Sequence, residues 1–142
     1  MFPSEKRDYI VIIKKNATLV QNILREIEQE AGTHPIIQAN CKRVLEESGD
    51  VYSVDRISEE GKIINVRIEA YGKGASIRGL ANRDRRPRTC IIDDPQDVED
   101  AKSETIQFTD WDWFLSDVML LGQHTRIFLI GNNLGDKSII ER

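Results

Sequence analysis

Residues 8–13 of the chain read Asp-Tyr-Ile-Val-Ile-Ile, and this short run of mostly β-branched apolar side chains decides the fold. A strand that is apolar on both faces must be covered on both, which is typical of a central strand in a parallel sheet. Directly after it, Asn16 can cap a helix whose apolar residues recur at three- and four-residue spacing as far as Ala31, and Gly32 ends the pattern. A strand followed at once by an amphipathic helix is half of a βαβ unit.

The next stretch changes its period. Pro35 suits the first turn of a short helix, which apolar residues extend to about Gly49 (Ile37, Cys41, Val44 and Leu45). Residues 51–58 and 64–70 then alternate in polarity on either side of residues 59–62, which predicts a β-hairpin. The hairpin is either an insertion or an antiparallel edge on an otherwise parallel sheet.

Two more apolar strands follow, at residues 89–92 and 126–131. Residues 95–121 between them are predicted to be mostly helical with a break near residues 103–105, and residues 135–142 are predicted to begin a last helix. Three apolar strands separated by helices, with one hairpin, predict a three-layer α/β fold with a mainly parallel sheet. A length of 142 residues fits one domain over residues 1–142.

Composition excludes several classes of protein. The 20 Lys and Arg residues against 24 Asp and Glu give a net charge of −4, which excludes a globally basic nucleic-acid binder but not a local basic patch. Neither a membrane span nor a signal peptide is recognisable, so we expect a protein without membrane contact, with Cys41 and Cys90 as reduced thiols. His34 and His124 have no partners at metal-ligand spacing and are assigned to no metal.

Polar residues follow two of the predicted strands. Asp93 and Asp94 end one strand, and Asn132 and Asn133 follow the other, so all four are expected at one edge of the sheet, where parallel sheets bind ligands. Adjacent carboxylates at the end of a buried strand are costly without a cation, and Mg²⁺, which arrives with phosphates, is a natural partner. The alternative is that Asp94 and Pro95 only start a turn or cap the next helix.

Residues 72–88 lose all periodicity, and within them residues 78–88 carry five arginines against one acid, Asp84, a local charge of +4 (Arg78, Arg83, Arg85, Arg86 and Arg88). Such a loop can contact DNA phosphates, or it can be a solvated connector, and no aromatic residue is interleaved to stack on bases. Four aromatic residues, Phe108, Trp111, Trp113 and Phe114, are predicted to be core on a helix whose Asp110 and Asp112 face water.

Four stretches of the chain resemble, in the expected order, segments of the ATPase domain of bacteriophage terminase large subunits, the DNA-packaging motors. Residues 86–100, Arg-Pro-Arg-Thr-Cys-Ile-Ile-Asp-Asp-Pro-Gln-Asp-Val-Glu-Asp, resemble the Walker B region. Residues 9–13 resemble the strand after the nucleotide-binding helix, residues 72–80 the Gly-rich loop with its Arg-Gly pair, and residues 126–133 the coupling motif. The resemblance implies a P-loop NTPase-like (RecA-like) fold and ATP-driven packaging of double-stranded DNA.

The resemblance also implies roles for single residues. Asp93 would be the Walker B acid that binds the cofactor's Mg²⁺, through water, and Asp94 stands where the family has its catalytic carboxylate, often Glu. Asn132 and Asn133 stand at the coupling tip, where they would sense the γ-phosphate or its water as part of the catalytic set. Arg78 would contact nucleotide or DNA. The implied cofactors are ATP and Mg²⁺.

One departure from the family is serious. Its Walker A loop should precede the strand at Tyr9, where only eight residues lie, and the carboxy-terminal nuclease domain is missing too. We therefore expect a partial ATPase domain, inactive alone, in the cytoplasm of a bacterial host. Implied partners are double-stranded DNA, the missing half of the domain, the portal and the small terminase subunit. Without its Walker A neighbour, the strand at residues 126–131 should be a sheet edge.

Two other functions stay open. One is a non-catalytic DNA- or protein-binding module that uses residues 78–88. The other is a small Mg²⁺-dependent nuclease built on Asp93 and Asp94, which would need further acids from other strands.

Overall fold

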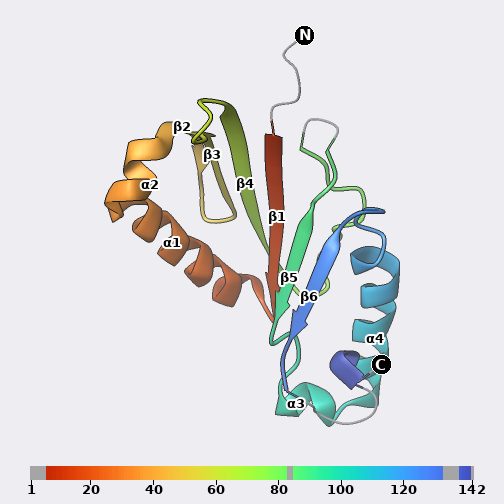
Figure 1. Cartoon of the computed structure of the whole chain (residues 1–142). Helices are drawn as coiled ribbons and strands as arrows, with labels where there is room; N and C mark the ends of the chain where they lie inside the picture. The colour runs from red at the N-terminus through yellow and green to blue at the C-terminus, as the bar shows by residue number, and fades with distance from the viewer. Residues whose placement is uncertain (1–5, 83–84, 133–137, 142) are drawn as a thin grey trace.

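The computed structural model describes residues 6–82, 85–132 and 138–141, which form a six-stranded sheet with helices on both faces (Figure 1). The strands are β1 (Lys6–Lys14), β2 (Cys41–Glu47), β3 (Val51–Ile57), β4 (Ile63–Gly72), β5 (Thr89–Asp93) and β6 (Arg126–Ile130), in the spatial order β2-β3-β4-β1-β5-β6. β4, β1, β5 and β6 run parallel, and β2, β3 and β4 are antiparallel. The predicted α/β fold, a mainly parallel sheet with an antiparallel hairpin, is confirmed.

The helices divide between the two faces of the sheet (Figure 1). They are α1 (Ala17–Thr33), α2 (Pro35–Asn40), α3 (Val98–Ala101) and α4 (Glu104–Trp113), which continues into a π-helical turn, η1 (Phe114–Val118); a 3₁₀ turn, η2, covers Ile139–Glu141. α1 begins as predicted, because the Asn16 side chain accepts the Leu19 N–H at 3.0 Å. The predicted break is also confirmed, since Ser103 caps α4 after α3 has ended.

Strand β1 carries the core on both of its faces. Tyr9, Val11 and Ile13 belong to a cluster with Cys90, Ile92 and residues of α4 and η1, including Trp113 and Val118. Ile12 belongs to a second cluster on the opposite face, with Val20 and Leu24 of α1 and with residues of β3 and β4. The strand is therefore central and covered on both sides, as its unbroken apolar run predicts.

The predicted helix over residues 35–49 is wrong beyond Asn40. Residues 41–47 form the edge strand β2, which turns the predicted hairpin into a three-stranded meander. Val44 and Leu45 suggested a helix by their spacing, but 50% and 39% of their surface is exposed. Backbone pairing with β3 overrides the local pattern here. Of the predicted last helix, the structure describes only residues 138–141, whose regular part is η2; residues 133–137 and 142 lie outside the described residues.

The aromatic cluster is only partly core. Trp113 is buried and donates its indole N–H to the Ala75 carbonyl at 2.8 Å, and Trp111 stacks on Phe114 with ring centroids 5.6 Å apart. Phe108 is 68% exposed, and Asp110, predicted to face water, is buried, so both predictions are wrong. Asp110 can be buried because a lysine and an amide bind its carboxylate, as described below. No helix within the described ranges is long and apolar enough to cross a membrane.

Candidate functional site

The candidate site lies at the edge of the sheet where the parallel strands end, which we call the carboxyl rim. Asp93 is the last residue of β5, and Asp94 follows it with a φ of 46°, a left-handed conformation that is uncommon outside glycine. The Asp94 N–H donates to the Ile130 carbonyl at 2.8 Å, which joins this turn to the end of β6. A Cβ atom on Gly131 would lie 3.6 Å from Asp94 Oδ1, so the exposed carboxylate lies over the end of β6.

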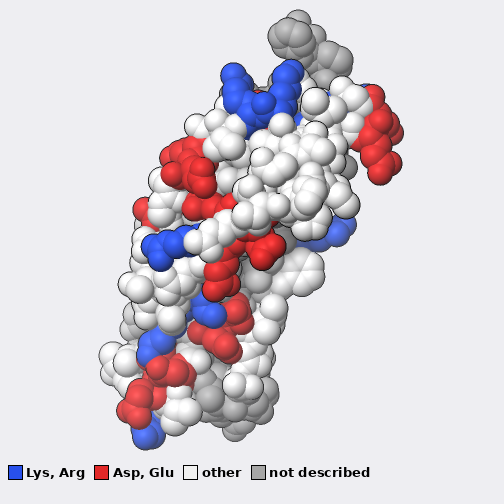
Figure 2. Space-filling model, turned by 90° about the vertical axis from the view of Figure 1, so that its left-hand side faces the viewer, with Lys and Arg blue, Asp and Glu red and all other residues white. Residues whose placement is uncertain are grey.

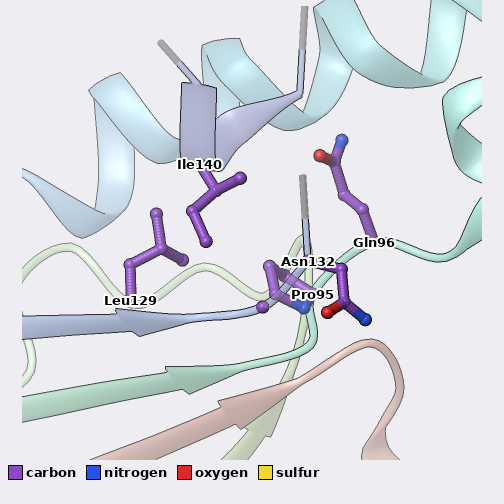
Figure 3. A pocket seen from close by; sticks show the side chains of 6 residues that line it. Pro95, Gln96, Leu129, Asn132 and Ile140 are labelled. Atoms are coloured by element: carbon purple, nitrogen blue, oxygen red, sulfur yellow. The ribbon is translucent and has the colours of Figure 1, made fainter. Parts of the chain in front are cut away.

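Asn132 is exposed at the carboxyl rim, two residues after the end of β6. With Pro95, Gln96 and Ile140 it lines a pocket of only about 10 Å³ (Figure 3). A space of this size holds about one water molecule. The structure thus brings Asp93, Asp94 and Asn132 to the carboxyl rim, as predicted, while Asn133 lies outside the described residues.

Arg78 does not join the carboxyl rim. The loop after β4 starts at the rim with Lys73 and runs along α4, where Ala75 bonds to Trp113. The Ile77 and Arg78 N–H groups then donate to the Asp117 carboxylate at 3.0 and 3.4 Å, beyond the end of α4. Arg78 is exposed, and its backbone lies beside Asp117 of η1, whereas Lys73 binds Asp110 of α4.

Three lysines that the sequence analysis did not single out lie among the acids of the rim. Lys14 Nζ is 3.1 Å from Asp93 Oδ2. Lys15 bonds to Asp97 and lies 3.8 Å from Asp100, and Lys73 lies 3.2 Å from Asp100 and 2.8 Å from Asp110. The rule that placed Asp93 at the carboxyl rim could have found them, because Lys14 and Lys15 follow the strand at residues 8–13 and Lys73 follows the hairpin.

The network continues into the backbone of α3 and η2. Asp97 caps α3 by accepting the Asp100 N–H at 2.9 Å, while Asp100 accepts the Asp97 N–H at 3.1 Å. Gln96 donates to Asp110 at 2.9 Å and accepts the Ile139 N–H at 2.9 Å. Asp93, Asp97, Asp100 and Asp110 thus have structural partners within the described residues.

The Lys15–Asp97 bond shifts both groups toward their charged forms. It holds the pKa of Asp97 below its usual value, with help from the backbone N–H groups of α3, and it raises the pKa of Lys15. Both side chains stay charged at neutral pH.

These residues do not fit a bound Mg²⁺ or a nucleotide–Mg²⁺ complex in this chain alone. The Asp93 carboxylate forms an ion pair with Lys14, so the ammonium group of Lys14 supplies the positive charge that a metal ion would bring. Among the described residues, no group of three or more His, Cys, Asp or Glu side chains could hold a metal ion, which leaves the nuclease alternative without its further acids. The chain passes from β1 to α1 through Lys15 and Asn16 only, too short a link to wrap a phosphate.

A second polar cluster, also missed in the sequence analysis, lies on the α4 face of β4. The buried Glu69 carboxylate accepts hydrogen bonds from Tyr9, from Tyr71 at 3.0 Å and from Arg67 at 2.8 Å, and Arg67 also reaches Glu46 of β2 at 3.4 Å. Burial and the neighbouring Glu69 raise the pKa of both phenols well above their usual value. Beside this cluster is an open groove of about 210 Å³, lined by Leu45, Glu46, Ser53, Asn65, Arg67 and Asn82.

The surface on the side of α1 and α2 carries mixed charge. Figure 2 shows acidic and basic groups interspersed along this side, with no continuous basic surface. This side therefore offers no extended site for a nucleic-acid backbone.

No protein-family model matches the sequence, and no curated protein matches it. Among solved structures, the chain is similar to the ATPase domain of a Thermus phage large terminase, with 11% identity and a TM-score of 0.49. The match covers 92% of this chain and 51% of that one, so the chain spans about half the length of the structure it matches.

Proposed function

We propose that the chain is the part of a terminase-type DNA-packaging ATPase that carries the acid-ended strand and the coupling strand, and that it hydrolyses no ATP alone. The observation that carries this is the juxtaposition of Asp93, Asp94 and Asn132 at the ends of the adjacent parallel strands β5 and β6. The ordered resemblance of the four sequence stretches supports the same proposal. In the complete motor, ATP hydrolysis with Mg²⁺ would drive double-stranded DNA through a portal in the host cytoplasm, together with the small terminase subunit.

The lysines of the carboxyl rim are the reason to expect no turnover. Phosphoryl transfer needs the β- and γ-phosphates held by a backbone cradle and a lysine. Here Lys14, Lys15 and Lys73 are bound to aspartates, and β1 passes directly into α1. In the proposed motor, a segment other than residues 1–142 would have to supply the phosphate-binding loop.

The test measures ATP turnover and Mg²⁺ binding by the purified chain. We expect no hydrolysis above buffer and no saturable heat on Mg²⁺ titration. Adding in trans a terminase-type ATPase segment that carries a Walker A loop should produce turnover that Asp93→Asn and Asp94→Asn remove, whereas Asp112→Asn, an exposed acid of α4, leaves it intact. Steady hydrolysis by the chain alone, lost on Asp94→Asn, contradicts the proposal.

The exposed arginines favour a second candidate, a non-catalytic module that binds DNA or a partner through residues 78–88. Arg86 donates to the Leu120 carbonyl at 2.9 Å and Arg88 lies 3.8 Å from Asp8, so both have structural contacts. Arg78 and Arg85 are exposed without an ion pair among the described residues; Arg83 lies outside them. Arg78 and Arg85 are therefore the arginines available to a phosphate backbone.

Salt dependence tests this candidate. Weak DNA binding should fall steeply with salt, and replacing Arg78 and Arg85 together by alanine should reduce the slope of log K against log salt by about 2. The matched control replaces the exposed Arg25 and Lys42 by alanine and should leave the slope unchanged. Absence of binding at low ionic strength would leave this loop as a connector.

A further inference from the structure

Strand β6 forms one edge of the described sheet, and one of its faces has no helix over it. Ile127 and Leu129 pack against the α4 core, while Phe128 and Ile130, on the opposite face, are 50% and 54% exposed. The helix on that face, α1, packs on β4, β1 and β3. Apolar side chains thus stand at the open edge of the sheet.

Within the described residues, the backbone of β6 is also unpaired along this edge. Arg126 donates its N–H to Arg88 at 2.8 Å, and the Ile130 carbonyl accepts from Asp94, so the even-numbered residues point their backbone groups at the β5 side. Backbone groups alternate in direction along a strand, so the N–H and C=O groups of Ile127 and Leu129 point to the open side. Unpaired groups of this kind are a template for another strand.

We propose that β6 pairs antiparallel with β6 of a second copy of the chain, about a twofold axis at Phe128. This register places Ile127 opposite Leu129 of the other copy, so that the open N–H and C=O groups bond to each other. Phe128 then lies opposite itself in a non-hydrogen-bonded pair, where side chains come closest and aromatic pairs stabilise a sheet. The contact is isologous and closes at two copies, which joins two sheets into one. The pairing concerns the chain by itself, because a Walker A strand supplied in trans, as the proposed function requires, would compete for the same edge.

Charge favours the antiparallel direction. In this register Arg126 lies opposite Ile130 of the other copy, so the two Arg126 guanidinium groups lie at opposite ends of the contact. Arg126 is exposed and, within the described residues, has no ion pair. Parallel pairing would place Arg126 against Arg126, a like-charge pair that destabilises a sheet.

Sedimentation velocity of the full chain over a wide concentration range tests the proposal. We expect a reversible monomer–dimer equilibrium whose Kd rises at least tenfold in Phe128→Asp. Phe108→Asp is the matched control, since it changes an exposed phenylalanine on α4, and should leave Kd unchanged.

Amide hydrogen exchange gives a second measurement on the unmodified chain. Exchange of the Ile127 and Leu129 amides should slow as protein concentration rises, whereas the Phe128 amide, which points toward β5, should not change. A monomer at every concentration, with fast exchange at both open amides, overturns the proposal. So does an association that Phe108→Asp removes and Phe128→Asp leaves intact.

Discussion

The two edges of the sheet are built in opposite ways. Edge strand β2 exposes Val44 and Leu45, but charged side chains surround them (Lys42, Arg43, Glu46 and Glu47), and its pairing with β3 slips twice, after Cys41 and after Val44. β6 is regular, carries one charge at its first residue and shows Phe128 and Ile130 to solvent. Charges and bulges are devices that prevent edge-to-edge pairing. The fold therefore protects edge strand β2 against pairing with another chain and leaves edge strand β6 able to pair.

The two halves of the sheet that end in these edge strands are also covered by different helices. The β2–β3–β4 half is covered by α1, and the β5–β6 half is covered by α4 and η1, with β1 shared between them. The Glu69 cluster joins β1 to β4 and, through Arg67 and Glu46, to the edge strand β2. Substitutions in each half should therefore affect the two edges differently.

The largest effect is expected for Glu69→Ala, which breaks the link between β1 and the β2 side. It leaves two phenols and the Arg67 guanidinium without their shared acceptor, so the free energy of unfolding should fall by about 3 kcal/mol. Urea denaturation measures it. Glu69→Gln, which keeps an acceptor, should lose less, and Glu99→Ala on the surface should change stability by no more than about 0.5 kcal/mol. Equal stability of Glu69→Ala and the native chain would show that the cluster does not join the halves.

Next in size is the difference in reactivity of the two cysteines, one in each half. Cys41 begins β2 and is partly exposed, while Cys90 of β5 is fully buried and burial raises its pKa to about 12. Because the thiolate is the reactive form, iodoacetamide should label Cys90 at least roughly tenfold more slowly than Cys41. Peptide mass spectrometry reads both sites in one sample. Equal rates would mean that the β5 side opens as readily as the β2 edge.

A smaller, pH-dependent effect is expected at the carboxyl rim, from Lys15 and Asp97. The lowered pKa of Asp97 means that its contribution is present above the unfolded value of about 3.9 and is lost as pH falls through the folded pKa. The raised pKa of Lys15 means that its contribution is present below about 10.4 and is lost as pH rises through the folded pKa.

Lys15→Met should therefore lower the thermal midpoint slightly between these limits and converge with the native chain at low pH. Lys102→Met, at an exposed lysine, is the control. A deficit of Lys15→Met that persists unchanged below pH 3 would contradict the ion pair as its cause.

The smallest effect is expected at the β2 edge itself. Leu45→Asp removes an exposed apolar residue from a strand that charges and bulges already protect, so it should leave the monomer–dimer equilibrium unchanged. Sedimentation velocity beside Phe128→Asp gives the comparison directly. Loss of association in Leu45→Asp would reverse the assignment of the two edges.

The parts of the fold that could be predicted are those where a local pattern and burial agree. Residues 9–13 and 90–92 are continuous apolar runs because both faces of these strands are covered or nearly so. β2 could not be predicted, because Cys41, Val44 and Leu45 have helical spacing and only the backbone of β3 makes the segment a strand. Tertiary pairing overrides propensity there.

The candidate site divides in the same way. The carboxyl ends of parallel strands meet at one edge, so the position of Asp93, Asp94 and Asn132 could be predicted. The lysines were not predicted, because acids at the end of a buried strand indicate a bound metal ion as readily as lysines of the same chain. Glu69 was missed because it alternates with apolar residues in β4, a position typical of a solvent-facing side chain; only Tyr9, from a distant part of the sequence, shows that it is buried.

The central place of β1 has a consequence for the order of folding. Its register pairs Lys6 with Ile64, 58 residues later, and Ile10 with Thr89, 79 residues later. At roughly 5–20 residues per second during synthesis, the β1 run waits at least about 3–12 s for its first partner strand. Contacts so distant in sequence slow folding, and an apolar strand that waits for its neighbours is a target for chaperones. The segment that decides the final fold is thus also the one that spends longest unpaired on the ribosome.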